Sequence, residues 1–209
     1  MISALTYQEM IENIQNNDLI EDTIGILLTR PDLDTGKNIL DSLNHYHHLT
    51  GRHINFYLPG YGAYWNTEAY PDMREVTIID GVSWSFSDRA FVSFVSKLEN
   101  VSSWKYSGES ELLIIPYFDK KLDFSKVGRF HLDAMLNDGA ISSISSFITN
   151  LSRVVQRDNS LNSIKVNGIV KNAKKNAVDE VMEKIPNYFS KFIKSSRHYL
   201  CHNYMRKNN

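Results

Sequence analysis

Cysteine, proline and long apolar runs are scarce in this chain of 209 residues, which has one cysteine (Cys201) and five prolines. A lone cysteine excludes an internal disulfide framework and fits a reducing compartment. No stretch approaches 18 consecutive apolar residues, so we expect no membrane-spanning helix. The first residues also lack the basic and then apolar pattern of a secretory signal. We therefore expect a cytoplasmic protein.

Complete catalytic and metal-binding signatures are missing as well. The segment Arg30–Lys37 (RPDLDTGK) resembles a phosphate loop only superficially, because Pro31 stands where the loop needs glycine and Asn38 where it needs Ser or Thr. Asp41, His45 and His48 share one helical face, but that face is predicted to meet solvent, so we expect no metal site. The sequence identifies no cofactor and leaves open whether the protein is an enzyme.

The composition is that of a globular protein with a real core, since 42% of the residues are hydrophobic and 22% are charged. The net charge of −1 hides an asymmetry. Residues 157–209 hold 11 Lys and Arg against 4 Asp and Glu (+7), and residues 1–156 hold 12 against 20 (−8). We therefore predict an α/β body over 1–156 and a basic helical appendage over 157–209.

Three short apolar runs, at 23–30, 53–60 and 111–119, read as strands separated by amphipathic helices. This alternation predicts an α/β fold with a mostly parallel, Rossmann-like sheet of about four to five strands. A fourth strand over 75–79 has no helix before it and is expected to run antiparallel. Two helical patterns at about 168–184 and 187–205 predict a C-terminal helical pair.

The chain after the first strand is a candidate phosphate site, because open α/β sheets place ligands at strand ends and helix N-termini attract anions. Arg30, Thr35, Gly36 and Lys37 would meet the phosphate. The alternative is plain capping of a surface helix, and Asp32 and Asp34 would repel an anion.

An aromatic segment follows the second strand, where Gly60, Tyr61 and Trp65 are candidates for contacting a base or nicotinamide. Long connections without a clear period are often functional. The alternative is that the rings merely cover an edge of the sheet.

Two carboxylates near predicted strand ends, Asp80 and Glu109, are the candidate catalytic residues. A carboxylate can stabilise the oxocarbenium-like transition state of N-glycosidic cleavage. Asp80 precedes Gly81, however, and a structural role in a turn is the alternative.

The predicted function is therefore a nucleotide- or dinucleotide-binding α/β domain that is a candidate for cleaving an N-glycosidic bond. The alternative is a non-enzymatic interaction or regulatory protein that forms homo-oligomers or binds a protein partner through its acidic body and its C-terminal helices. Nucleic-acid binding through the basic tail is a third, less favoured hypothesis.

Overall fold

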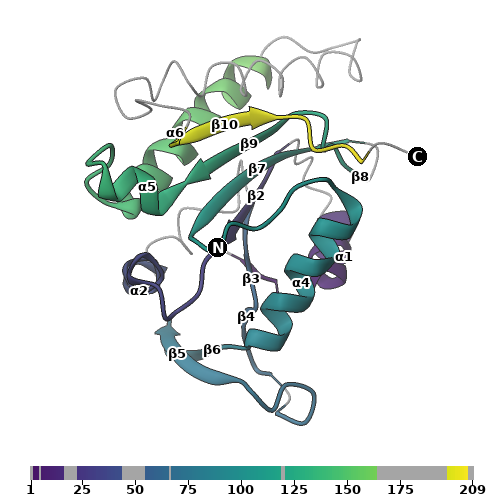
Figure 1. Cartoon of the computed structure of the whole chain (residues 1–209), viewed down its shortest axis with the longest axis vertical. Helices are drawn as coiled ribbons and strands as arrows, with labels where there is room; N and C mark the ends of the chain where they lie inside the picture. The colour runs from purple at the N-terminus through teal and green to yellow at the C-terminus, as the bar shows by residue number, and fades with distance from the viewer. Residues whose placement is uncertain are drawn as a thin grey trace.

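The computed structural model describes residues 2–4, 6–16, 23–43, 55–65, 67–118, 121–163 and 197–206. They form one large and one small sheet with helices on both faces of the large one (Figure 1). Sheet A contains β1 (Ile2–Ala4), β2 (Thr23–Leu28), β3 (Asn55–Pro59), β7 (Glu111–Phe118), β8 (Lys121–Leu122), β9 (Val127–His131) and β10 (Tyr199–His202). Sheet B contains β4 (Tyr61–Ala63), β5 (Arg74–Ile79) and β6 (Val82–Phe86). The helices are α1 (Tyr7–Asn16), α2 (Asp34–Asp41), α4 (Asp88–Val101), α5 (Leu132–Asn137) and α6 (Ile144–Ser163).

The prediction of a mostly parallel, Rossmann-like sheet is wrong. The order in sheet A is β1-β3-β2-β7-β9-β10, and β8 pairs with β7. Strand β3 runs parallel to β1 and β2, but β7, β9 and β10 each pair antiparallel with the strand before them in this order. Sheet A is therefore mixed, with its parallel part at one side.

The direction of β7 is set by residues 102–110, an extended segment whose sequence has neither a helical nor a strand pattern. Helix α4 begins beside the end of β3, where the Ser87 N–H donates to the Gly60 carbonyl. It carries the chain back to the end of the sheet where β2 and β3 begin, and a strand parallel to them would start there. Instead, residues 102–110 run back across the sheet (Figure 1), since nine extended residues reach about 30 Å. Strand β7 consequently starts where β2 ends.

Side-chain capping bonds fix where α1 and α4 begin. The Glu9 N–H donates to Thr6 Oγ1 (3.1 Å), and the Thr6 N–H donates to the Glu9 carboxylate (3.3 Å), which is a complete capping box. Ser87 Oγ accepts from the Ala90 N–H (3.0 Å) at the start of α4. Local sequence therefore fixes where these two helices begin.

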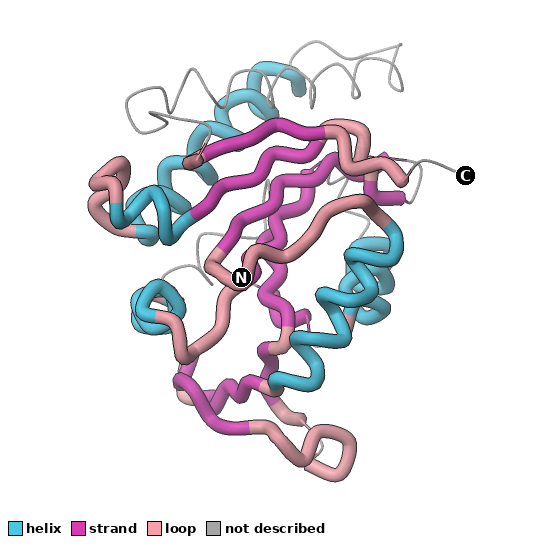
Figure 2. The backbone as a smooth tube through the Cα atoms, viewed as in Figure 1, coloured by secondary structure: helices cyan, strands magenta, loops and turns pink. Residues whose placement is uncertain are grey.

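The two faces of sheet A carry different layers. In register, Ile26 pairs with Tyr57 on β3 and with Leu113 on β7, so these side chains share one face. The Tyr57 hydroxyl donates to Asn13 of α1 (2.8 Å), and α1 packs against α4, so both helices cover this face. Phe130 of β9 lies on the other face and contacts Phe147 of α6. Sheet B continues from β3 at the end of the molecule where β2 and β3 finish (Figure 2).

The predicted C-terminal helix over 187–205 is wrong where the structure describes it. Residues Tyr199–His202 form β10, an antiparallel strand beside β9. The Ser103 N–H donates to the Tyr204 carbonyl (2.7 Å), and Arg206 donates to the Asn100 carbonyl at the end of α4 (2.6 Å). The end of the chain is thus part of the body. Positions 168–184 lie outside the described residues, and the division of the chain at 157 stays a prediction.

A buried histidine fastens the start of β10. His198 Nε2 lies 2.9 Å from the carboxylate of Asp138, which follows α5, and the His198 carbonyl accepts from the His131 N–H (3.0 Å). The hydrogen bond to His198 holds the pKa of Asp138 below its ordinary 3.8. Because the pKa of Asp138 is lower in the folded protein, its ionised carboxylate stabilises the fold above pH 3.8, its ordinary pKa. This stabilisation is lost as the pH falls through the pKa of Asp138 in the folded protein.

We therefore expect Asp138→Asn to lower the melting temperature at pH 7 and to have a smaller effect near pH 3. The measurement is thermal unfolding of both proteins across this range, followed by circular dichroism. A difference that stays the same at every pH would contradict the assignment of this carboxylate as the titrating group.

None of the helices in the described part of the chain is long and apolar enough to cross a membrane.

Candidate ligand site at the end of the sheet

The candidate site lies where β2, β3 and β9 end and β7 begins. Leu28 pairs with Glu111, which in turn pairs with His131, so the three strand ends are level with one another. The residues that follow or precede these ends bring polar groups onto both faces of the sheet. We describe them as a hydroxyl network, a buried ion pair and an Arg30–Tyr106 site.

The hydroxyl network joins Thr29, Thr35, Ser110 and Asp133. Ser110 Oγ lies 2.7 Å from Thr29 Oγ1 and 2.8 Å from Thr35 Oγ1, and Thr35 Oγ1 donates to the Asp133 carboxylate (2.8 Å). Since the proton of Thr35 is used on Asp133, Ser110 must donate to Thr35 and Thr29 to Ser110. The Ser110 N–H donates to the other Asp133 oxygen (2.5 Å). Each hydroxyl has a partner, so this network locks α2, α5 and β7 together.

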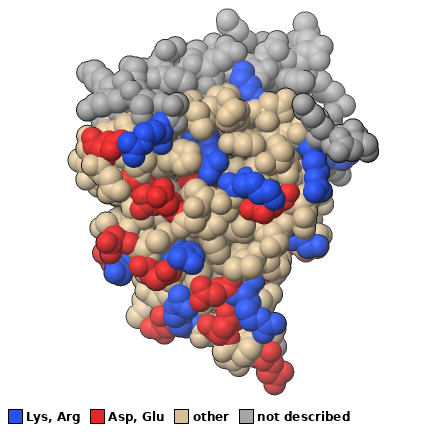
Figure 3. Space-filling view, in the orientation of Figure 1, with Lys and Arg blue, Asp and Glu red and all other residues tan. Residues whose placement is uncertain are grey.

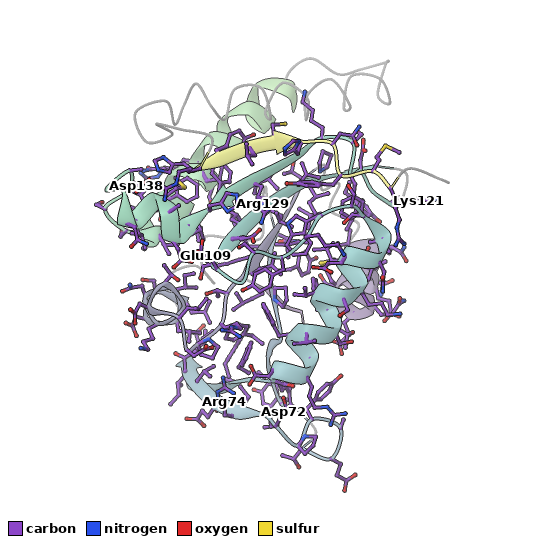
Figure 4. The ribbon with its side chains drawn as sticks, in the orientation of Figure 1. Asp72, Arg74, Glu109, Lys121, Arg129 and Asp138 are labelled. Carbon is purple, nitrogen blue, oxygen red and sulfur yellow. The ribbon has the colours of Figure 1, made fainter. Side chains whose placement is uncertain are left out.

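The buried ion pair joins Glu111 and Arg129 on the opposite face. Glu111 is 0% exposed, and two guanidinium nitrogens of Arg129 reach its two carboxylate oxygens at 2.7 Å each. The Ser107 N–H (2.8 Å) and hydroxyl also donate to Glu111, which fastens the segment 102–110 to the sheet. Burial alone would lower the pKa of Arg129, but the hydrogen-bonded Glu111 carboxylate raises it above its usual range. Figure 4 labels Arg129 on β9, well away from Arg74 near sheet B.

The Arg30–Tyr106 site consists of Arg30, Asp32, Tyr61 and Tyr106. Arg30 follows β2, and its Nη2 donates to Asp32 (3.0 Å). Among the described residues, Arg30 Nε and the Tyr106 hydroxyl are buried and have no hydrogen-bond partner. Burial raises the pKa of Tyr106, the Arg30 cation lowers it, and nearby Glu111, Asp133 and Asp32 raise it. The hydroxyl therefore keeps its proton and is a hydrogen-bond donor, like Arg30 Nε.

Tyr61 and Tyr106 pack against aromatic rings of sheet B and α4. Tyr61 contacts Phe86 with ring centroids 4.6 Å apart, and Phe91 contacts Tyr106 edge to face at 5.5 Å. The Tyr61 hydroxyl donates a long hydrogen bond to the Thr29 carbonyl (3.3 Å). The two unpaired donors, Arg30 Nε and the Tyr106 hydroxyl, can bind a group that carries an acceptor oxygen.

The four residues predicted to meet phosphate do not converge on one ligand. Thr35 turns its hydroxyl inward to Asp133, and Gly36 packs so tightly that an added Cβ would lie 1.8 Å from the Arg30 carbonyl oxygen. Lys37 is exposed and pairs with Asp34 (3.2 Å). Of the four, Arg30 contributes an unpaired donor.

The aromatic candidates Tyr61 and Trp65 lie on opposite faces of β4. Gly62 would direct a Cβ into the Trp65 ring, 2.0 Å from Nε1, so Trp65 covers the face of β4 opposite to Tyr61. Trp65 contacts Tyr70 instead (5.6 Å). Gly60 has a φ of +78° and lies against Phe91, which lets β3 bend into β4. The structure brings Tyr61, but not Trp65, to the end of β2, where its hydroxyl meets the Thr29 carbonyl.

The two candidate catalytic carboxylates lie in turns. Asp80 (φ +48°) and Gly81 (φ +79°) form the tight connection between β5 and β6, with the positive φ pair of a type I′ turn. Glu109 is exposed in the turn before β7 (Figure 4), and its N–H donates to Ser107 Oγ (3.2 Å). Both side chains are hydrated, and neither is buried in a way that would prepare it for general acid catalysis.

The sequence analysis did not select Tyr106, Ser110, Glu111 and Arg129. Two features of the sequence could have identified the Glu111–Arg129 pair. Glu111 opens an otherwise apolar strand, and Arg129 lies two residues from His131 in an alternating run, as expected for one face of a strand. Pairing them requires the register between β7 and β9, which local patterns do not determine.

No group of three His, Cys, Asp or Glu side chains in the described part of the chain could hold a metal ion, and His45 and His48 lie outside it. On the face seen in Figure 3, acidic and basic side chains alternate, and neither gathers into one patch. This face therefore lacks the continuous basic surface typical of nucleic-acid binding.

Comparison of the chain with protein-family models, with curated proteins and with solved structures gave no match.

Proposed function

We propose that this chain binds a small ligand of the nucleotide class at the Arg30–Tyr106 site. One observation carries the proposal: two buried hydrogen-bond donors, Arg30 Nε and the Tyr106 hydroxyl, have no partner among the described residues. A buried donor without a partner costs roughly 1–3 kcal/mol, so most proteins avoid it. A ligand that supplies an acceptor would recover that cost.

The Arg30–Asp32 ion pair lies on the solvent side of the proposed site. The side chains of Arg30 and Asp32 are 37% and 54% exposed, and they form the outer boundary of the site. An exposed ion pair of this kind contributes at most about 1 kcal/mol to stability. The pair therefore opens at low cost and does not bar a ligand.

The proposal covers binding and not cleavage, because Asp80 and Glu109 are exposed turn residues. Oligomerisation or partner binding through the C-terminal helices stays a prediction. Much of the predicted pair lies outside the described residues, and the described residues after 196 pack on the body.

Tyr106→Phe tests the proposal because it removes only the hydroxyl. We expect ligand affinity to fall about five- to tenfold, the value of one net hydrogen bond, while the unliganded protein becomes slightly more stable. The measurement is a thermal-shift screen against nucleosides and nucleotides, followed by calorimetric titration of any ligand that raises the melting temperature.

Tyr117→Phe is the matched control. Tyr117 lies near the other end of β7, and its hydroxyl is also buried without a partner among the described residues. Both variants should gain stability, but only Tyr106→Phe should lose affinity. Equal affinity of the two variants would count against a ligand at Tyr106.

A further inference from the structure

The Arg30–Tyr106 site also indicates which part of a nucleotide enters it, an inference that rests on the proposed function. The charge of Arg30 is already balanced. Asp32 holds Nη2 at 3.0 Å, and the buried Nε has no partner among the described residues. An uncharged oxygen can accept from Nε while Asp32 keeps Nη2. A phosphate at Nε would instead lie beside the Asp32 carboxylate and be repelled by it.

The wider surroundings of the Tyr106 hydroxyl are also unfavourable to an anion. Asp32, Glu111 and Asp133 all raise the pKa of Tyr106, and the nearby Arg30 cation lowers it. Arg129 offsets Glu111, whereas the partners of Asp133 in the described part of the chain are the uncharged Ser110 N–H and Thr35 hydroxyl. Bringing a phosphate dianion into this environment would cost its hydration without a matching cation.

The start of α2 offers no alternative phosphate site. Its N-cap residue, Leu33, makes no side-chain capping bond, and the positive end of the helix dipole lies between Asp32 and Asp34. Lys37 pairs with Asp34 and is 63% exposed, so its charge is compensated outside the site. The carboxylates therefore screen the helix end that would otherwise attract an anion.

The donor set and the aromatic cluster beside it together define the ligand group. Arg30 Nε and the Tyr106 hydroxyl are both donors, and the Tyr106 ring packs edge to face on Phe91 in an aromatic cluster. We infer that Arg30 and Tyr106 bind the carbonyl oxygen of a planar heteroaromatic ring, such as an oxo-nucleobase or nicotinamide, and that the phosphate groups stay outside the site. Specificity then depends on the carbonyl group, because a ring without it would leave both donors unpaired.

Inosine and adenosine provide a matched pair of probes, because a carbonyl oxygen of inosine is replaced by an amino group in adenosine. Calorimetric titrations would compare them with uridine, nicotinamide riboside, inosine 5′-monophosphate and inorganic phosphate. We expect at least one carbonyl-bearing nucleoside to bind, and adenosine to bind at least about tenfold more weakly than inosine if inosine is that ligand. Adding the 5′-phosphate should improve affinity by less than about threefold.

Asp32→Asn and Asp34→Asn separate the effects of the two carboxylates. Asp32→Asn should raise the affinity for the monophosphate relative to its nucleoside, whereas Asp34→Asn should leave this ratio nearly unchanged, because Asp34 faces Lys37. Competition by inorganic phosphate, or a monophosphate that binds much more tightly than its nucleoside to the wild type, would overturn this inference and leave the proposed function standing. If no nucleoside or nucleotide binds, or if binding is insensitive to Tyr106→Phe, the proposed function fails together with it.

Discussion

Glu111→Ala is expected to lower the free energy of unfolding by about 3–5 kcal/mol, the usual effect of removing one partner from a buried ion pair. The substitution leaves Arg129, whose side chain is 13% exposed, without its carboxylate partner. It also removes the acceptor that holds Ser107 and, through it, the segment that carries Tyr106. Urea unfolding at pH 7 would measure the change.

Two comparisons make this result specific. Lys37→Ala breaks the exposed Lys37–Asp34 pair and should change the free energy of unfolding by less than about 1 kcal/mol. Replacing Glu111 and Arg129 together by leucine should recover most of the loss, because no buried charge then remains unpaired. A loss below about 1 kcal/mol for Glu111→Ala alone would contradict the described burial of this pair.

Gly36→Ala should destabilise the protein by about 3 kcal/mol or more, although alanine ordinarily favours a helix over glycine by roughly 1 kcal/mol. An added Cβ would lie 1.8 Å from the Arg30 carbonyl oxygen and 2.8 Å from its carbon. Both atoms belong to the backbone, so no side chain can turn aside, and α2 must move away from the end of β2. This movement would also disturb Arg30.

Asn38→Ala is the control for Gly36→Ala. Asn38 lies two residues further along α2 on its exposed side, and its amide donates to the Asp34 carbonyl (3.1 Å). Losing this bond and gaining helix propensity should nearly cancel, within about 0.5 kcal/mol. The midpoint of urea unfolding would be compared for both variants. A Gly36→Ala protein as stable as the wild type would show that α2 does not pack against Arg30 as described.

Local patterns predicted local structure well. The apolar runs correspond to β2, β3 and β7, the capping box opens α1, and Ser87 caps α4. These features are determined by residues close in sequence. Strand direction is not, because it depends on where residues 102–110 lead the chain after α4. The alternating run Val82–Phe86 was overlooked, and with it sheet B.

The candidate site was predicted only in part for the same reason. Arg30 and Tyr61 follow strand ends, and the general rule for open α/β sheets was sufficient to select them. Tyr106 reaches the site from the extended segment before β7, which carries no periodic pattern. Trp65 was expected beside Tyr61, but the chain turns at Tyr64 after β4, and the Trp65 ring lies over Gly62 on the face opposite to Tyr61.

The NMR signal of the Arg30 Nε–H proton is the most direct test of ligand binding at the Arg30–Tyr106 site. In a ¹H–¹⁵N spectrum, the signal is assigned by its loss in Arg30→Lys, and Arg74, whose guanidinium pairs with Asp88, serves as the reference. On addition of a carbonyl-bearing nucleoside such as inosine, we expect the Arg30 signal to move downfield and to exchange more slowly with water, while the Arg74 signal stays in place. If inosine, uridine and nicotinamide riboside all leave the Arg30 signal unchanged at saturating concentration, the account of this site is contradicted.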